Sequence, residues 1–230
     1  MSALTAPTPR LAAVGQWLKI WLLCIAAAVV YGILHDQVTA RLCLAYFTVG
    51  HAPVFPTQDP TLLGIGWGVI ATWWAGAILG LPTVLAMRLG RRPAWGSPQL
   101  VRPLAALMAS VGLAALLAGI VGYALAQAGL VRLPQVTLAT LPPGVEAGFI
   151  SASWAHLTSY AGGIVGGVAL WVWLWRHRSP AHTAPRRPGL RAVAMGAGLA
   201  LLAALWLGGL FVGYTVSQTT QDYYFPAGGR

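Results

Sequence analysis

The chain has 230 residues, of which 57% are hydrophobic and only 8% are charged. Soluble domains usually carry about 25% charged residues, so the composition excludes an ordinary soluble enzyme and indicates a protein embedded in a membrane. The net charge of +10 does not predict a nucleic-acid partner, because the basic residues flank apolar runs, where they act as topology signals and contact anionic lipids. We therefore expect membrane lipids as partners and no nucleic acid.

Long apolar runs recur along the whole chain and are separated by short polar segments. At a rise of about 1.5 Å per residue, the first run covers the thickness of a hydrocarbon core. The sequence predicts five transmembrane helices, at residues 14–34, 61–87, 103–130, 153–175 and 192–216. No long soluble insert interrupts them, so we expect one all-α, polytopic membrane domain over residues 1–230.

Two features modify this simple series of helices. Apolar residues recur at helical spacing over residues 37–49 without glycine or proline, which predicts a short interfacial helix after the first span. Within the second span, Pro82 lacks the N–H that would bond to the carbonyl of Ile78, so a kink is expected near Ile78.

The basic residues predict the orientation of these spans. They concentrate in the loops at residues 88–102 and 176–191, and if the N-terminus is cytoplasmic, only Arg41, Arg132 and Arg230 of the 14 lie outside. By the positive-inside rule, the N-terminus is inside and the C-terminus outside, as expected for a multi-pass protein of a bacterial inner membrane. All four acidic residues then lie outside, namely Asp36, Asp59, Glu146 and Asp222.

Ionisable residues at or within a membrane are costly and therefore candidates for function. His35 and Asp36 end the first span, and His156 lies in what is predicted to be the first turn of the fourth, where the helix dipole favours a neutral imidazole. With Glu146 they form a set of ligand types suited to a transition metal such as Zn or Fe. We expect a metal site at His35, Asp36, His156 and Glu146, with Glu146 also the candidate catalytic base. Neighbouring helix residues point about 100° apart, so only one of His35 and Asp36 is expected to face a given partner.

A possible groove continues from His156 along the same helix face. Tyr160, Gly163 and Gly167 follow it at helical spacing and form a candidate cofactor-binding surface, and Gly162 and Gly166 form a second small-residue pair. Small residues four apart let another helix approach closely, so these faces are also candidates for binding a membrane-protein partner or a second copy of the chain.

Three functions remain open on the sequence alone. The first is a metal-binding protein, for example a hydrolase, that acts on a lipid-linked or exported substrate. The second is a non-enzymatic membrane subunit or assembly factor, with Asp36 simply paired to Arg41 and Glu146 to Arg132. The third is a haem-binding or proton-relay protein that uses His35 and His156. No HExxH, CxxC or glycine-rich phosphate loop selects among them.

Overall fold

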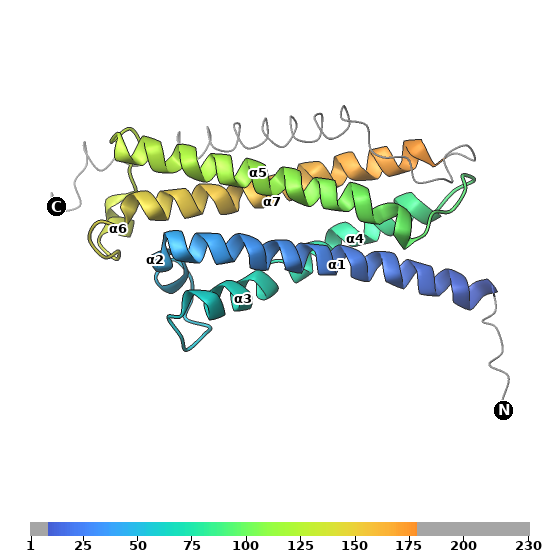
Figure 1. The fold of residues 1–230 in the computed structure, drawn as a ribbon, viewed down its shortest axis with the longest axis horizontal. Helices are drawn as coiled ribbons and strands as arrows, with labels where there is room; N and C mark the ends of the chain where they lie inside the picture. The colour runs from blue at the N-terminus through green and yellow to red at the C-terminus, as the bar shows by residue number, and fades with distance from the viewer. Residues whose placement is uncertain (1–8, 179–230) are drawn as a thin grey trace, which may run out of the picture.

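The computed structural model describes residues 9–178, so the predicted fifth span at residues 192–216 lies outside the described part. The described residues form helices joined by loops, without strands (Figure 1). Four helical stretches are long and apolar enough to cross a membrane: Ala13–Leu42, Pro60–Arg88, Ser97–Gln127 and Glu146–His177. This arrangement fits a multi-pass membrane protein.

The first helix is longer than predicted. Helix α1 spans Pro9–Leu42 and therefore includes residues 37–42 of the predicted interfacial helix. The short helix α2, Leu44–Thr48, covers most of the remaining residues and is separated from α1 at Cys43. The prediction of an interfacial helix over residues 37–49 is therefore wrong for its first half. Helix α1 continues because its polar side chains find partners on the helix that begins at Pro60: Gln37 Nε2 donates to the Thr61 carbonyl at 3.0 Å, and Arg41 Nη2 donates to Thr61 Oγ1 at 2.9 Å.

The second span is interrupted at a position that the sequence did not predict. Helix α3, Pro60–Ile70, is separated from helix α4, Trp73–Arg88, by Ala71 and Thr72. Pro82 lies inside α4 without ending it, and the kink expected near Ile78 stays a prediction. Asp59 caps α3 by accepting from the backbone N–H groups of Thr61 and Leu62 at 2.9 Å.

The long helices associate as two pairs. Helix α1 packs along α3 and α4, and helix α5, Ser97–Gln127, packs along helix α7, Glu146–His177, over its length (Figure 1). Glycines allow the close approach in the first pair: a Cβ on Gly68 would lie 2.5 Å from the Ile33 backbone. The small-residue pattern of α3 and α4 is a packing signal that the sequence reading missed.

Helices α5 and α7 both begin before their predicted starts at residues 103 and 153. Helix α5 starts at Ser97 because the Gly96 backbone N–H donates to Gln99 Oε1 at 3.1 Å, which closes the first turn. Between them lies the short helix α6, Gln135–Leu138. The two pairs share a core near the α4–α5 loop, where Ile20, Met87 and Leu174 are fully buried.

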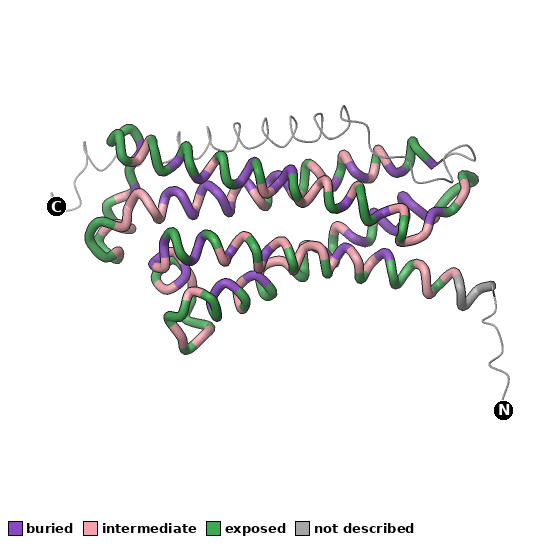
Figure 2. Tube along the Cα trace, viewed as in Figure 1, coloured by how far each residue is buried: buried purple, intermediate pink, exposed green. Residues whose placement is uncertain are grey.

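Burial follows the contacts between helices (Figure 2). The outward faces carry large apolar side chains such as Leu22, Leu81 and Leu113, all exposed in the isolated chain. Such faces are stable only against hydrocarbon or another apolar surface, which agrees with insertion of these helices in a membrane.

Candidate metal centre

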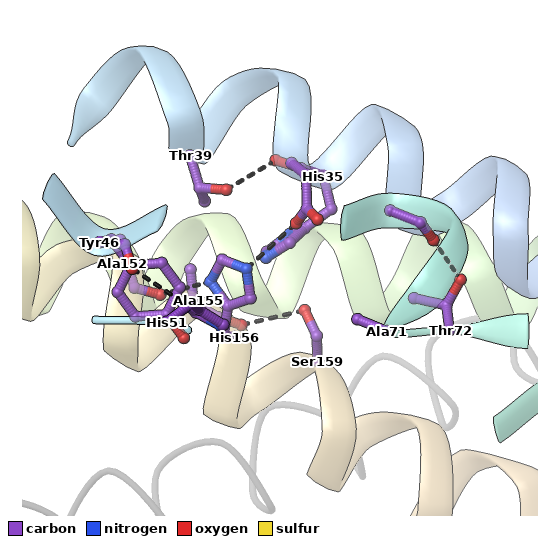
Figure 3. Close-up of polar contacts among 12 residues, drawn as sticks. His35, Thr39, Tyr46, His51, Ala71, Thr72, Ala152, Ala155, His156 and Ser159 are labelled. Atoms are coloured by element: carbon purple, nitrogen blue, oxygen red, sulfur yellow. Dashed lines mark hydrogen bonds and ion pairs between the residues drawn. The ribbon is translucent and has the colours of Figure 1, made fainter. Parts of the chain in front are cut away.

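His35 and Asp36 on α1 meet His156 on α7 between the two helix pairs (Figure 3). One ligand atom from each of the three residues lies within 4.8 Å of the others. The closest contact joins His156 Nε2 and Asp36 Oδ1 at 3.1 Å, and the rings of His35 and His156 lie edge to face with centroids 4.5 Å apart. Three of the four predicted ligands are therefore brought together.

Both neighbours on α1 reach the same histidine, although only one was expected to do so. The His156 ring contacts both the His35 ring and the Asp36 carboxylate. The alternative pairing of Asp36 with Arg41 is not observed, since Arg41 is bonded to Gln37 and Thr61.

The hydrogen bonds of His156 determine which ring nitrogen carries a proton. Its Nδ1 lies 2.8 Å from the Ala152 carbonyl, which can only accept, so Nδ1 carries the hydrogen and donates. In the neutral ring, Nε2 then presents a lone pair to the Asp36 carboxylate, which is also an acceptor. Two acceptors at 3.1 Å are stable only with a proton or a metal cation between them. The arrangement also matches metal-ligating histidines, whose second nitrogen usually donates to a carbonyl or carboxylate.

His35 adds an unpaired nitrogen to this group. Its Nε2 atom is buried and has no hydrogen-bond partner in the described part of the chain. The Tyr31 ring stacks on the imidazole with centroids 5.7 Å apart. A buried polar atom without a partner costs about 1–3 kcal/mol, so this nitrogen gains by binding a cation.

An aromatic layer from α2 and the following loop covers the site. Cys43 is extended and turns the chain, which places the Tyr46 ring 4.5 Å from the His156 ring. Burial, and to a smaller extent Tyr160 and Asp36, raises the pKa of the Tyr46 phenol above its usual value, so the phenol stays neutral near neutral pH. His51 packs on Phe47 in this layer, and its Nδ1 donates to the Tyr46 carbonyl at 2.8 Å. The sequence reading missed the layer, because the turn at Cys43 carries no glycine or proline.

Glu146, the fourth predicted ligand, lies apart from the group. It begins α7, ten residues before His156, which is about 15 Å along a helix. Its Oε1 accepts from the Leu133 backbone N–H at 2.8 Å, and its Oε2 lies 3.8 Å from Arg132 Nη1, which is the simple pairing considered as an alternative. Because α7 begins here, His156 lies in the third helical turn rather than the first, and the dipole argument made for it does not apply.

The predicted groove lines a cavity next to the three residues. Tyr160, Gly163 and Gly167 line an apolar cavity of about 270 Å³ that also borders His35, Asp36 and His156. The neighbouring pair, Gly162 and Gly166, faces α5 instead, where a Cβ on Gly162 would lie 3.3 Å from Val111. A second cavity of about 950 Å³ lies between α1 and α5, and Tyr31 and His35 border both cavities.

Three further side-chain hydrogen bonds join α7 to the first helix pair. Tyr31 and Ser159 share a bond of 2.6 Å near the site, the Tyr160 hydroxyl donates to the Ala71 carbonyl at 3.4 Å, and Trp171 Nε1 donates to Thr83 Oγ1 at 2.9 Å farther along α7. Together with the Asp36–His156 contact, they set the position of α7 relative to α1 and α4, and therefore the spacing of the three candidate ligands.

Comparison with known proteins adds no assignment: no protein-family model, curated protein or solved structure matches this chain. The chemistry of the site therefore rests on its residues. Two imidazoles and one carboxylate form the ligand set of several catalytic zinc sites and of non-haem iron(II) centres, which keep coordination positions open for water or substrate.

Proposed function

We propose that this chain is a membrane-embedded metal-binding protein in which His35, Asp36 and His156 hold one transition-metal ion, such as Zn²⁺ or Fe²⁺. The observation that carries the proposal is the convergence of the unpaired, buried Nε2 of His35 with the Asp36–His156 pair. One cation satisfies all three groups, whereas a proton shared by Asp36 and His156 leaves His35 unpaired.

The geometry favours a small ion over haem. A haem held by two histidines lies between their rings, each bonded to the iron from an opposite face. The rings of His35 and His156 are only 4.5 Å apart between centroids and stand at 78° to one another, which leaves no space for a porphyrin between them. A single ion at the common edge of the group needs no such space.

With three protein ligands, such an ion retains at least one coordination position. A metal in this state lowers the pKa of bound water and polarises a bound oxygen, which is the basis of hydrolysis by zinc enzymes. In the proposed topology of five spans with the N-terminus inside, the site lies toward the outer face of a bacterial inner membrane. We propose a lipid-linked or exported molecule as its substrate, and the proposed catalytic role of Glu146 gains no support from its position.

A second candidate is a non-enzymatic membrane subunit, supported by the cleft of about 950 Å³ between α1 and α5. Its α5 wall carries the small residues Ala105, Ala109 and Gly112, which suit a partner helix or a second copy of this chain. This reading predicts a native complex larger than one chain after mild detergent extraction, and a smaller species for Ala109→Leu. A wild-type protein that migrates as a single chain would contradict it.

The metal proposal is tested by the metal content of the full-length protein, purified in detergent from cells supplied with zinc and iron. We expect about one ion per chain for wild type and less than about a tenth of an ion for His156→Ala or His35→Ala. Glu146→Gln is the matched control and keeps its metal, because Glu146 lies outside the group. A wild-type content below a tenth of an ion, or equal content in His156→Ala, would overturn the proposal.

A further inference from the structure

The apolar cavity beside the three candidate ligands is elongated along the helices. At one end it borders His35, Asp36 and His156, and at the other Thr83 and Trp171. His156 and Trp171 are fifteen residues apart on α7, which corresponds to about 22 Å of helix. The cavity is therefore a channel along the helix axes that ends at the proposed metal, rather than a rounded pocket.

The walls of this channel are apolar, and its side is open. Its volume of about 270 Å³ exceeds that of an apolar cavity of about 150 Å³ that stays dry and binds benzene. Ile78 on α4 and Ile164 on α7 line it and are 60% and 59% exposed, so the opening lies between these two helices and faces the hydrocarbon. Gly163 leaves the channel open on the α7 side, because it has no side chain and a Cβ at this position would meet no atom within 4 Å.

The two ends of the channel differ in their free polar groups. At the far end, Trp171 Nε1 donates to Thr83 Oγ1, and that hydroxyl donates to the Leu79 carbonyl, so these groups already have partners. At the near end, His35 Nε2 has none. A polar head group is therefore stabilised only at the metal end, which fixes the direction in which an amphipathic molecule would lie.

We propose that this channel binds the hydrocarbon chain of a single-chain lipid whose anionic oxygen head group, a carboxylate or phosphate, coordinates the metal. The inference rests on the proposed metal site. A divalent ion held by one carboxylate and two neutral imidazoles keeps a net positive charge, which favours an anionic ligand in an apolar environment. The chain enters from the membrane between α4 and α7 and extends from the metal toward Trp171.

The test uses palmitic acid carrying a diazirine in its chain, added to the full-length protein in detergent. After irradiation, we expect labelled peptides from α4 and α7 at the channel. Gly163→Leu places a side chain inside the channel and is expected to reduce this labelling by about tenfold or more, the equivalent of about 1.4 kcal/mol or more of lost binding free energy. Gly15→Leu is the matched control, because a Cβ at Gly15 also meets nothing within 4 Å but lies outside the channel.

Metal content measured on the same samples separates this proposal from the metal site. Gly163→Leu that keeps its metal and loses labelling supports the lipid proposal and shows that the variant is folded. Equal labelling of Gly163→Leu and wild type overturns it, whatever the metal content. Wild-type protein without metal overturns the head-group contact and the proposed function together.

A second variant and a competition experiment complete the test. Ala75→Leu enters the channel from the α4 side and is expected to reduce labelling as Gly163→Leu does. Unlabelled palmitate and hexadecyl phosphate, added as competitors, distinguish a carboxylate from a phosphate head group. Failure of both competitors to reduce labelling of the wild type would overturn the proposal.

Discussion

Two contacts between a carboxylate and a basic side chain link separate segments of this chain, and they differ in distance and in exposure to solvent. Asp36 and His156 connect α1 to α7 at 3.1 Å, with side chains only 5% and 11% exposed. Glu146 and Arg132 connect the start of α7 to the preceding loop at 3.8 Å, with side chains 25% and 58% exposed. In the sequence, both carboxylates look like members of one site, and only one of them is.

The difference follows from the surroundings. A carboxylate among apolar helices loses its hydration and depends on a nearby cation or proton, so removing one partner is costly. A pair exposed to water is screened and contributes little to stability. The buried pair can therefore hold helices together or hold an ion, whereas the exposed pair positions a loop.

The largest expected loss of stability comes from breaking the buried pair, and its size distinguishes that pair from the exposed one. In metal-free protein prepared with a chelator, His156→Ala leaves Asp36 buried without its partner and is expected to lower the free energy of unfolding by about 3–5 kcal/mol. The measurement is reversible unfolding in sodium dodecyl sulfate, followed by tryptophan fluorescence. A loss below about 1 kcal/mol would mean that the buried pair is no stronger than an exposed one.

Replacing both members of the buried pair sharpens the comparison. The double variant Asp36→Leu with His156→Leu removes both charges together, so we expect its free energy of unfolding to lie within about 1 kcal/mol of wild type or above it. The same protein is expected to bind no metal. A double variant as unstable as His156→Ala would show that the packing of the histidine ring, rather than charge, accounts for the single-variant loss.

Substitution of His35 is expected to change the free energy of unfolding by a smaller amount and in the opposite direction, toward higher stability. His35→Phe keeps an aromatic ring beside Tyr31 but removes the buried nitrogen that has no partner. Metal-free protein should become more stable by about 1 kcal/mol, while metal binding weakens by at least about tenfold. Unfolding and metal titration of the same preparation test both statements, and a loss of stability without loss of metal would contradict them.

The smallest change in the free energy of unfolding is expected for the exposed pair, Glu146 and Arg132. Glu146→Gln keeps an oxygen that can accept from the Leu133 N–H and removes only the charge, so we expect a loss of at most about 1 kcal/mol. That loss should shrink further when the salt concentration is raised from about 0.1 M to about 1 M, because the charges face solvent. A larger, salt-independent loss would place Glu146 in a more buried setting than the structure shows.

Much of the fold follows from the length of the apolar runs. Four of the five predicted spans coincide with long helices, since twenty or more apolar residues have no other stable form in a membrane. His35, Asp36 and His156, which the predicted topology puts on one side of the membrane, lie close together in the structure. These are properties of single segments, and a sequence displays them directly.

The ends of helices and the turns between them were less predictable, and the errors at the site came from there. The polar residues after Asp36 looked like the end of α1, but Gln37 and Arg41 are satisfied by Thr61 on α3. Glu146 was grouped with His156 because both were predicted at the same side and depth of the membrane. Instead, α7 begins at Glu146, and Ser153, its expected start, lies inside the helix, where Ser153 Oγ donates to the Phe149 carbonyl. Both depend on contacts between segments, which no local pattern contains.

The separation of Asp36 and His156 by 120 positions in the chain has a consequence for biogenesis. During synthesis, α1 enters the membrane long before α7 exists, so its carboxyl group is inserted without a partner. An acidic residue at the centre of an inserting helix costs about 2.5–3.5 kcal/mol, which is an upper bound for Asp36 because it lies six residues from the end of α1. The most apolar window of α1 has a mean hydropathy of 2.1. This hydrophobicity is sufficient to offset the cost of inserting Asp36 into the membrane. The hydrophobicity of the first helix thus allows a site that is assembled from α1 and the much later α7.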